Sequence, residues 1–328
     1  KHAACCKVFG GIRVIPTAYY QIWEDGDLRW DASAVVTGSD GKGSEAIVQL
    51  ISGSRLKGGI AINKWDINKM KTPYVTACRN SGMNFAFFRM DNTMLKLAQV
   101  DYALGDAAEA LSLVNQLRAR AGLAGLASVD DYAIIDEFKR ECIGDGDIKF
   151  AELRAGKFTE LGKAMRAELK TVIAGLEKDG YYTFKNGRTI SNYVWTKLVD
   201  ISGKKVGVNT HNRVEGDPVL SPGWRGVYDY TTTTSSGAVV GEKHNLAIEG
   251  LFEYIDPAGE EAKALEADGY KKTDWAIGMV KEKANMWDYN MLSGIDDSDV
   301  PLYFHPLPLT TIQQSKGQVT NGYSLPQQ

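Results

Sequence analysis

Residues 102–123 read YALGDAAEALSLVNQLRARAGL and contain the clearest helix signals of the sequence. Asp106 stands three residues before Glu109, which is the spacing of a capping box at the start of a helix. Apolar residues then recur at helical spacing at Ala110, Leu111, Val114 and Leu117. Gly105 separates this helix from the residues before it, and Gly122 supplies a C-terminal cap. The stretch therefore predicts a helix with one apolar face.

The residues before Gly105 predict a second helix that packs against the first. Its apolar positions share the same periodicity and are Met94, Leu95, Leu97, Ala98 and Tyr102. Two apolar helix faces joined by a very short link must fold back as a hairpin. This hairpin resembles the central part of a tetratricopeptide unit, and one such unit needs neighbouring helices. Further helices are predicted over residues 130–142 and from about residue 159 to residue 178.

The flanking regions have a different character. Residues 1–90 contain no long helical period and predict an irregular chain with some strand. Residues 181–245 are rich in Tyr, Thr, Gly and Val and predict hairpins, while residues 257–285 are predicted to be helical in part. Local expectations are strands at 46–51 and 64–66, hairpin turns at 185–187 and 202–204, and an irregular proline-rich tail from residue 301.

The composition limits the classes of function. The 328 residues are 44% hydrophobic and 24% charged, which is typical of a globular protein that buries a core. A formal net charge of -3 gives no basic surface for nucleic acid or for an anionic membrane. The longest aliphatic runs are only a few residues, so none is predicted to span a bilayer. The sequence begins at Lys1 without the pattern of a signal peptide, so we expect a processed, trimmed or partial chain.

Four cysteines and four histidines offer no predicted metal centre. Cys5, Cys6, Cys78 and Cys142 match no zinc spacing, and we expect them to be small buried or free thiols. The histidines suggest neither a metal site nor a nucleophilic catalytic group. No cofactor is expected. A structural calcium ion bound by oxygen ligands at residues 294–299 is the one weak alternative.

Several stretches resemble one family when they are taken in order. They are Pro16-Thr17 with Tyr20, GDLR at 26–29, Lys64-Trp65, NFAFFRM at 84–90, VNQLRARAGL at 114–123, Ile135-Asp136-Glu137 with Arg140-Glu141, ELRAGKF at 152–158, and FHPLP at 304–308 with Gln318 and Asn321-Gly322-Tyr323. The run at 114–123 is the most specific. Together these stretches resemble the SusD/RagB family of outer-membrane nutrient-binding lipoproteins, over about residues 16–158 and 301–323.

The chain departs from that family at three of its motifs, and at one of them Glu152 stands where aspartate is common. Residues 144–147 read GDGD where the family has a glutamate-glycine-x-arginine element, and the closing motif lacks its proline. Residues 180–300 match nothing in the family pattern. The sequence therefore resembles a divergent member.

The resemblance implies a mainly α fold with irregular and β loop regions. We expect one SusD-like C-terminal domain over residues 1–328, with the last tetratricopeptide-like pair and a loop-rich half. Its subregions are an irregular or stranded part at 1–90, a helical part at 91–180, a mixed insertion at 181–300 and a closing tail at 301–328. Earlier repeats would lie upstream, and their absence would leave apolar helix faces exposed.

The resemblance also implies a location and partners. Proteins of this family lie on the outer surface of the outer membrane and reach the membrane only through a lipid anchor on the N-terminal part. They cap a SusC-like TonB-dependent transporter and deliver oligosaccharides to it. The family fixes no universal binding residues, so none can be transferred to this chain.

Aromatic side chains on predicted loops are the candidates for sugar binding, because a sugar needs a flat apolar face and nearby polar groups. The first cluster is Trp224 with Tyr228 and Tyr230. The second cluster is Tyr181-Tyr182 with Tyr193 and Trp195, and the third is Trp23 with Trp30. The residues favoured as glycan ligands are Trp224, Tyr228, Tyr230, Trp195, Tyr182 and Trp30. The alternative for each is packing in the core.

Three functions follow, in descending order of support. The first is non-catalytic binding of a glycan for import. The second is a helical-repeat interaction scaffold without a sugar site, suggested by residues 94–122. The third is an enzyme acting on polysaccharide, which would need two carboxylates at a defined separation. Acidic residues such as Asp25, Asp27, Asp296, Asp297 and Asp299 are better explained as charged loop turns. The sequence leaves open which glycan binds and whether this chain binds it alone.

Overall fold

The structure is a computed structural model that describes residues 13–14, 16–39, 45–50, 60–62, 64, 88–200, 206–207, 224–225, 231–233, 239–241, 244–277, 309–316 and 318. More of these residues lie in helices than in strands, so the fold is mainly α-helical with smaller β regions, as predicted. The helices are α2 (Pro16–Ile22), α3 (Trp30–Ser33), α4 (Met90–Ala103), α5 (Ala107–Arg120), α6 (Asp131–Cys142), α7 (Ile148–Arg154), α8 (Phe158–Lys178), α9 (Glu260–Ala267), α12 (Leu309–Gln314) and the 3-10 helix η1 (Val48–Leu50).

The strands form small antiparallel sheets. One sheet has the order β1-β5-β2 and another the order β13-β8-β14, while β3-β4, β6-β7, β9-β10 and β11-β12 are two-stranded. The strands are β1 (Arg13–Val14), β2 (Ala34–Val35), β3 (Thr37–Ser39), β4 (Glu45–Ile47), β5 (Ile60–Ile62), β6 (Tyr181–Thr183), β7 (Thr189–Ser191), β8 (Tyr193–Asp200), β9 (Val206–Gly207), β10 (Trp224–Arg225), β11 (Thr231–Thr233), β12 (Val239–Gly241), β13 (His244–Glu249) and β14 (Lys271–Asp274).

Helices α4 and α5 form the predicted hairpin. The Asp106 side chain accepts a hydrogen bond of 3.1 Å from the Glu109 backbone N–H, which confirms the predicted N-cap. At the other end Gly122 has φ +79°, and the Leu123 N–H donates to the Arg118 carbonyl at 2.9 Å. This bond across a left-handed residue closes α5 in the manner of a Schellman motif.

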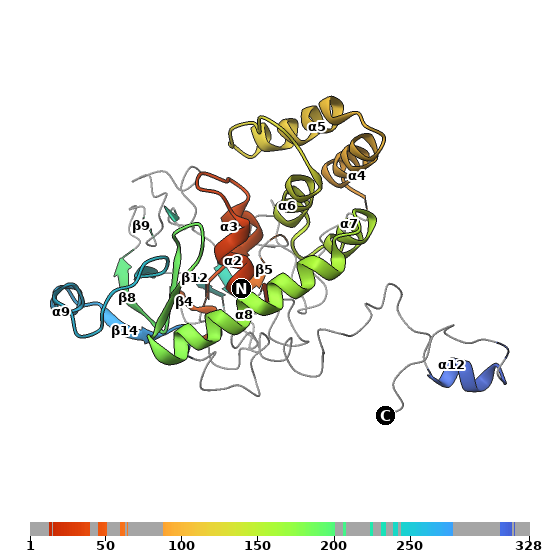
Figure 1. Cartoon of the computed structure of the whole chain (residues 1–328). Coiled ribbons are helices and arrows are strands. Elements are labelled where there is room, and N and C mark those ends of the chain that lie inside the picture. The colour runs from red at the N-terminus through yellow and green to blue at the C-terminus, as the bar shows by residue number, and fades with distance from the viewer. Residues whose placement is uncertain are drawn as a thin grey trace.

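The helical core lies between α4, α5, α6 and α7, which Figure 1 shows together on one side of the molecule. Its buried members are Leu95, Ala98, Ala110, Leu113, Val114, Leu117, Ile134, Phe138, Cys142 and Ala151. Asp130 caps α6 by accepting from the Ala133 N–H at 2.8 Å, so this helix begins where the sequence predicts. Burial of these apolar side chains is the main term that stabilises the helical half.

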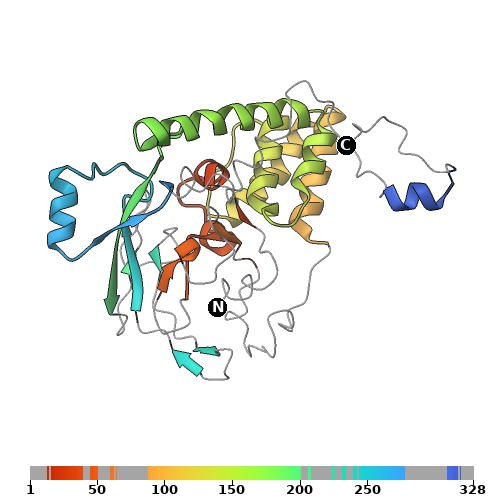
Figure 2. The same cartoon turned by 90° about the horizontal axis from the view of Figure 1, so that it is seen from below.

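Helix α8 runs from the helical half to the sheets (Figures 1 and 2). It buries Leu169, Val172, Ile173 and Leu176 and leads through Gly180 into β6. Gly175 allows α8 and β6 to lie in close contact, because a Cβ at this position would meet the Tyr181 carbonyl oxygen at 3.0 Å. The hairpin β6–β7 therefore packs directly on the last turns of α8.

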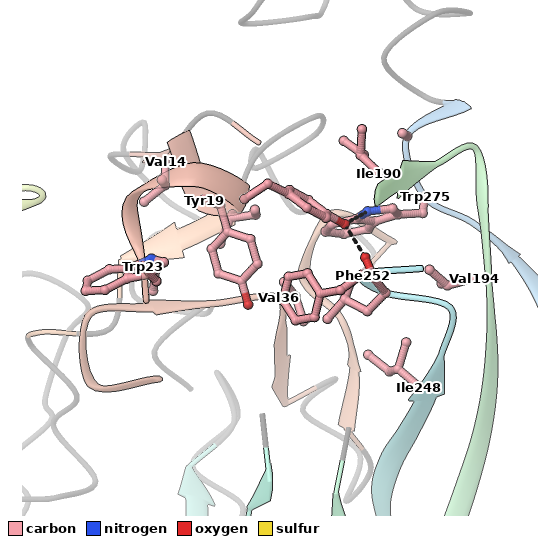
Figure 3. Close-up of a cluster of buried hydrophobic side chains, with 14 of the residues drawn as sticks. Val14, Tyr19, Trp23, Val36, Ile190, Val194, Ile248, Phe252 and Trp275 are labelled. Atoms are coloured by element: carbon pink, nitrogen blue, oxygen red, sulfur yellow. Dashed lines mark hydrogen bonds between the residues drawn. The ribbon is translucent and has the colours of Figure 1, made fainter. Parts of the chain in front are cut away.

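The second core is rich in aromatic side chains from segments far apart in the sequence (Figure 3). Tyr19 packs edge-on to Trp30 and stacks on Phe252, with ring centroids 5.5 and 5.9 Å apart. The buried Tyr20 hydroxyl donates to the Leu251 carbonyl at 2.5 Å and accepts from Trp275 Nε1 at 3.0 Å. Burial raises the pKa of Tyr20, so the hydroxyl stays protonated. These contacts join α2 to the loop after β13 and to the residue after β14.

The structure differs from the sequence predictions at short elements. Helix α7 was not predicted, because its seven residues are too few for a clear period. The strand predicted at 46–51 is β4 followed by the 3-10 turn η1, and the first ninety residues include the short helices α2 and α3. The turn predicted at 185–187 joins β6 and β7, and Gly187 has φ +87°. The turn at 202–204 lies outside the described residues.

Candidate functional site

A buried network of charges holds the turn at residues 26–29 against α6. The Arg29 guanidinium binds Asp27 through two bonds of 2.8 and 2.7 Å and also donates to Glu137 and Glu141 at 2.5 and 2.8 Å. Asp27 and Glu137 are fully buried. Arg29 is the cation that pairs with Asp27, whereas Glu137 also accepts from Arg140 at 2.8 Å, so both buried carboxylates are paired with arginines. Within the Gly-Asp-Leu-Arg turn, Asp27 and Arg29 therefore have a structural role at the contact with α6.

A second set of ion pairs ties the same region to α5. Arg118 donates to both carboxylate oxygens of Glu24, at 2.6 and 2.8 Å, and Arg140 donates to Glu24 at 2.8 Å. The hydrogen bonds from Arg118 lower the pKa of Glu24. Of the acidic residues weighed for hydrolysis, Asp25 binds Arg188 at 2.7 Å and Asp27 binds Arg29. These carboxylates act as partners of arginines at a packed junction.

Two of the predicted glycan ligands lie in the interior. Trp30 is 2% exposed, stacks on Trp23 and has the Arg188 guanidinium 4.5 Å from its ring centre. Trp195 is 1% exposed and packs with Ile255. The alternative of core packing therefore describes both tryptophans, since neither ring presents a face to solvent. We do not propose them as glycan contacts.

The other predicted ligands are placed differently. Tyr182 is half-buried and packs edge-on to Phe184 at 5.1 Å, and burial together with the Glu168 charge raises its pKa. Trp224 lies in β10, opposite Gly207, but its side chain is outside the described part of the structure. Tyr228 and Tyr230 also lie outside the described residues. The first predicted cluster stays a prediction.

An exposed pair of tyrosines was only half anticipated by the sequence. Tyr181 at the start of β6 and Tyr254 in the loop after β13 stack with ring centroids 4.1 Å apart and an angle of 26° between their planes. Tyr181 is 36% exposed and Tyr254 is 37% exposed. The sequence grouped Tyr181 with Tyr193 and Trp195, whereas Tyr254 gave no signal, because its partner lies on a distant segment.

The hairpin beside this pair carries hydroxyl groups on the same face. Tyr181 lies opposite Ser191, and Thr183 lies opposite Thr189, so all four side chains point to one side of the hairpin. The two threonine hydroxyls are hydrogen-bonded at 2.8 Å. The Ser191 hydroxyl oxygen is buried without a hydrogen-bond partner. Thr189 and Ser191 are buried, so Thr183 is the residue of this set whose side chain is exposed beside the aromatic pair.

A third surface is the outward face of α4. Its exposed positions carry no charge and are Met90, Thr93, Leu97, Val100, Ala103 and Leu104. Leu104 is 81% exposed and Met90 is 76% exposed. An uncharged stripe along a whole helix is the apolar patch that the sequence predicts for a repeat unit without its neighbour.

No metal centre or membrane span emerges from the described residues. Among them no group of three or more His, Cys, Asp or Glu side chains could hold a metal ion. The weak calcium candidate at 294–299 lies outside them. The helices that the structure describes include none with the length and apolar character to cross a bilayer.

Of the comparisons with known proteins, the one with family models agrees with the motifs. No curated protein matches the sequence. Among solved structures, the chain is similar to surface glycan-binding protein A from Bacteroides uniformis, with 27% identity, a TM-score of 0.32, and coverage of 42% of this chain and 28% of that one. The chain thus corresponds to less than a third of that protein's length. The model of the SusD family, SusD_RagB, matches residues 18–193, which is more than half of the chain. This protein therefore belongs to the SusD family.

Proposed function

We propose that this protein binds oligosaccharides or polysaccharides at the cell surface without cleaving them and delivers them to a SusC-like TonB-dependent transporter. Membership of the SusD family is the observation on which the proposal rests. The matched segment, residues 18–193, includes the helical hairpin and strands β2 to β7. The exposed, stacked side chains of Tyr181 and Tyr254 support glycan binding. The pairing of Asp25 and Asp27 with arginines supports a non-catalytic role. A glycosidase needs one carboxylic acid and one carboxylate that are free to act on the substrate.

The segment that contains Trp224, Tyr228 and Tyr230 stays our first proposed binding region. Three aromatic residues within seven positions, next to Gly223 and Gly226, can present rings on a short turn. Flat ring faces contact the apolar C–H face of a sugar, while neighbouring polar groups bind its hydroxyls.

Affinity electrophoresis tests this proposal. The chain is run through native gels that contain different plant and host polysaccharides, with Trp224→Ala alongside. We expect one class of polysaccharide to retard the wild type and the variant to migrate faster in that gel. A wild-type chain that migrates unchanged in every gel would contradict glycan binding by this chain. Equal retardation of both proteins would move the site away from Trp224.

A second candidate function is a helical interaction scaffold, which the uncharged face of α4 favours. Leu97, Val100 and Leu104 lie on this face and are about half to four-fifths exposed. Such a face can receive an amphipathic helix. A pull-down that recovers a soluble protein partner from wild type but not from Leu97→Glu, with no transporter in either, would favour the scaffold over import.

A further inference from the structure

We propose that Tyr181 and Tyr254 form a separate stacking platform for the pyranose rings of a neutral glycan. The inference rests on the proposed function and adds a site that does not involve Trp224. Each ring covers one face of the other, and the pair remains more than a third exposed.

The loop that carries Tyr254 is held rigidly. Its neighbours Leu251, Phe252 and Ile255 are all buried. The Leu251 carbonyl accepts from the Tyr20 hydroxyl at 2.5 Å, and the Phe252 carbonyl accepts from the Thr189 N–H at 2.7 Å. Tyr254 is thus fixed on the surface before a ligand arrives, so little conformational entropy is lost on binding.

Tyr181 is held equally well from the other side. It follows Gly180, which has φ +82° and accepts a hydrogen bond of 2.8 Å from the Asn192 N–H to its carbonyl. The Asn192 side chain also donates to the Leu176 carbonyl at the end of α8, at 2.9 Å. Figure 2 shows the end of α8 meeting the sheet of β8, β13 and β14. Tyr181 therefore stands on the junction between the longest helix and the sheets, and its ring direction is set by two rigid elements.

The surroundings of the pair favour a neutral glycan. Sugar hydroxyls can donate to carboxylates and exchange hydrogen bonds with hydroxyls. Thr183 is exposed beside Tyr181, and Asp256 lies close enough to Tyr254 that its charge, after burial, raises the pKa of that tyrosine. Lys178 and Lys185, the cations nearest to Tyr181 in sequence, are both exposed, and Lys178 is paired with Asp179 at 3.5 Å. The Asp256 charge beside Tyr254 would repel a uronate or sulfate group, so we infer that acidic glycans bind worse.

Isothermal titration with the whole chain tests the platform. The probes are hydroxyethylcellulose, galactomannan and a mixed-linkage glucan as neutral polysaccharides, and polygalacturonate as the acidic one. The variants are Tyr181→Ala, Tyr254→Ala and the corresponding Phe substitutions. Tyr132→Ala is the matched control, because Tyr132 is 38% exposed but lies on α6. Circular dichroism and thermal unfolding check that each variant is folded.

We expect each Ala variant to bind the neutral probe about tenfold or more weakly, while the Phe variants and Tyr132→Ala bind like wild type. If both Ala variants bind the neutral probe as tightly as the wild type does, the platform is overturned and the proposed function still stands. Binding of polygalacturonate alone, lost in the Ala variants, would overturn the neutral class. A wild-type chain that binds none of the probes, nor any polysaccharide in the gel panel, would overturn the function and the platform together.

Discussion

Gly175 shows how one residue sets the position of the aromatic surface. A Cβ on Gly175 would lie 3.0 Å from the Tyr181 carbonyl oxygen, whereas a Cβ on Gly162 of the same helix would meet nothing within 4 Å. We expect Gly175→Ala to lower the free energy of unfolding by about 1–3 kcal/mol, because the backbone of β6 must shift. Gly162→Ala should raise it by about 0.5–1 kcal/mol through the better helix propensity of alanine. Urea unfolding of the two variants checks this. Equal effects of the same sign would contradict the close contact.

Arg29 and Arg120 share one carboxylate but differ in burial. Both donate to Glu141, yet the Arg29 side chain is 10% exposed and the Arg120 side chain is 57% exposed. Arg29→Met should lower the free energy of unfolding by about 3–5 kcal/mol, because the buried Asp27 loses its guanidinium partner and Glu137 keeps only Arg140 and Arg118. Arg120→Met should lower the free energy of unfolding by less than about 1 kcal/mol, because the Arg120 side chain is exposed. Chemical denaturation measures both costs. Similar values would show that the buried network does not hold the turn.

Glu24 gives the same junction a defined pH dependence. The pKa of its carboxyl group is lowered from 4.5, first by hydrogen bonds from Arg118. A lowered folded-state pKa means that the contribution is fully present above pH 4.5 and is lost as the pH falls through the lowered value. We therefore expect the stability difference between wild type and Glu24→Gln to shrink below pH 4.5. Thermal unfolding at several pH values checks this, and a difference that is constant with pH would be inconsistent with the ion pair.

At the scale of elements, α4 separates an inward from an outward face. Leu95 is fully buried, whereas Leu104 is 81% exposed. Leu95→Ala should lower stability by about 2–5 kcal/mol through loss of burial and a cavity. Leu104→Ala should change it by no more than about 0.5 kcal/mol, while reducing the binding of a hydrophobic dye. Fluorescence and urea titrations of both variants test this. A large loss of stability for Leu104→Ala would mean that this face is covered in the chain itself.

The sequence predicts the long helices well, since their signals are local. Periodicity and caps at Asp106, Gly122 and Asp130 are contained within each helix and its ends. Local signals of this kind do not distinguish buried from exposed aromatic residues. Trp30 is buried by Phe252 and Tyr181 is paired with Tyr254, and in each case the partner lies on a distant segment. Which aromatic residue faces solvent is thus decided by tertiary contacts.

At the scale of the whole molecule, the chain joins a helical half and an aromatic β half through α8 (Figure 1). Both halves contribute to the segment that matches the SusD family, residues 18–193. The exposed tyrosine pair lies where α8 meets the sheets, whereas the apolar face of α4 lies in the helical half. The surface proposed for glycan contact and the surface that could dock a helix are therefore separate, and substitutions can perturb them one at a time.

We propose that the protein binds a glycan and leaves it intact. The most direct measurement is isothermal titration of the wild-type chain with the polysaccharide that retards it most in gels, followed by assay of reducing ends in the same mixture. We predict saturable binding of the polysaccharide to the protein and no increase in reducing ends over time. No bound polysaccharide at any protein concentration, or a steady rise in reducing ends that depends on the protein, would contradict the claim.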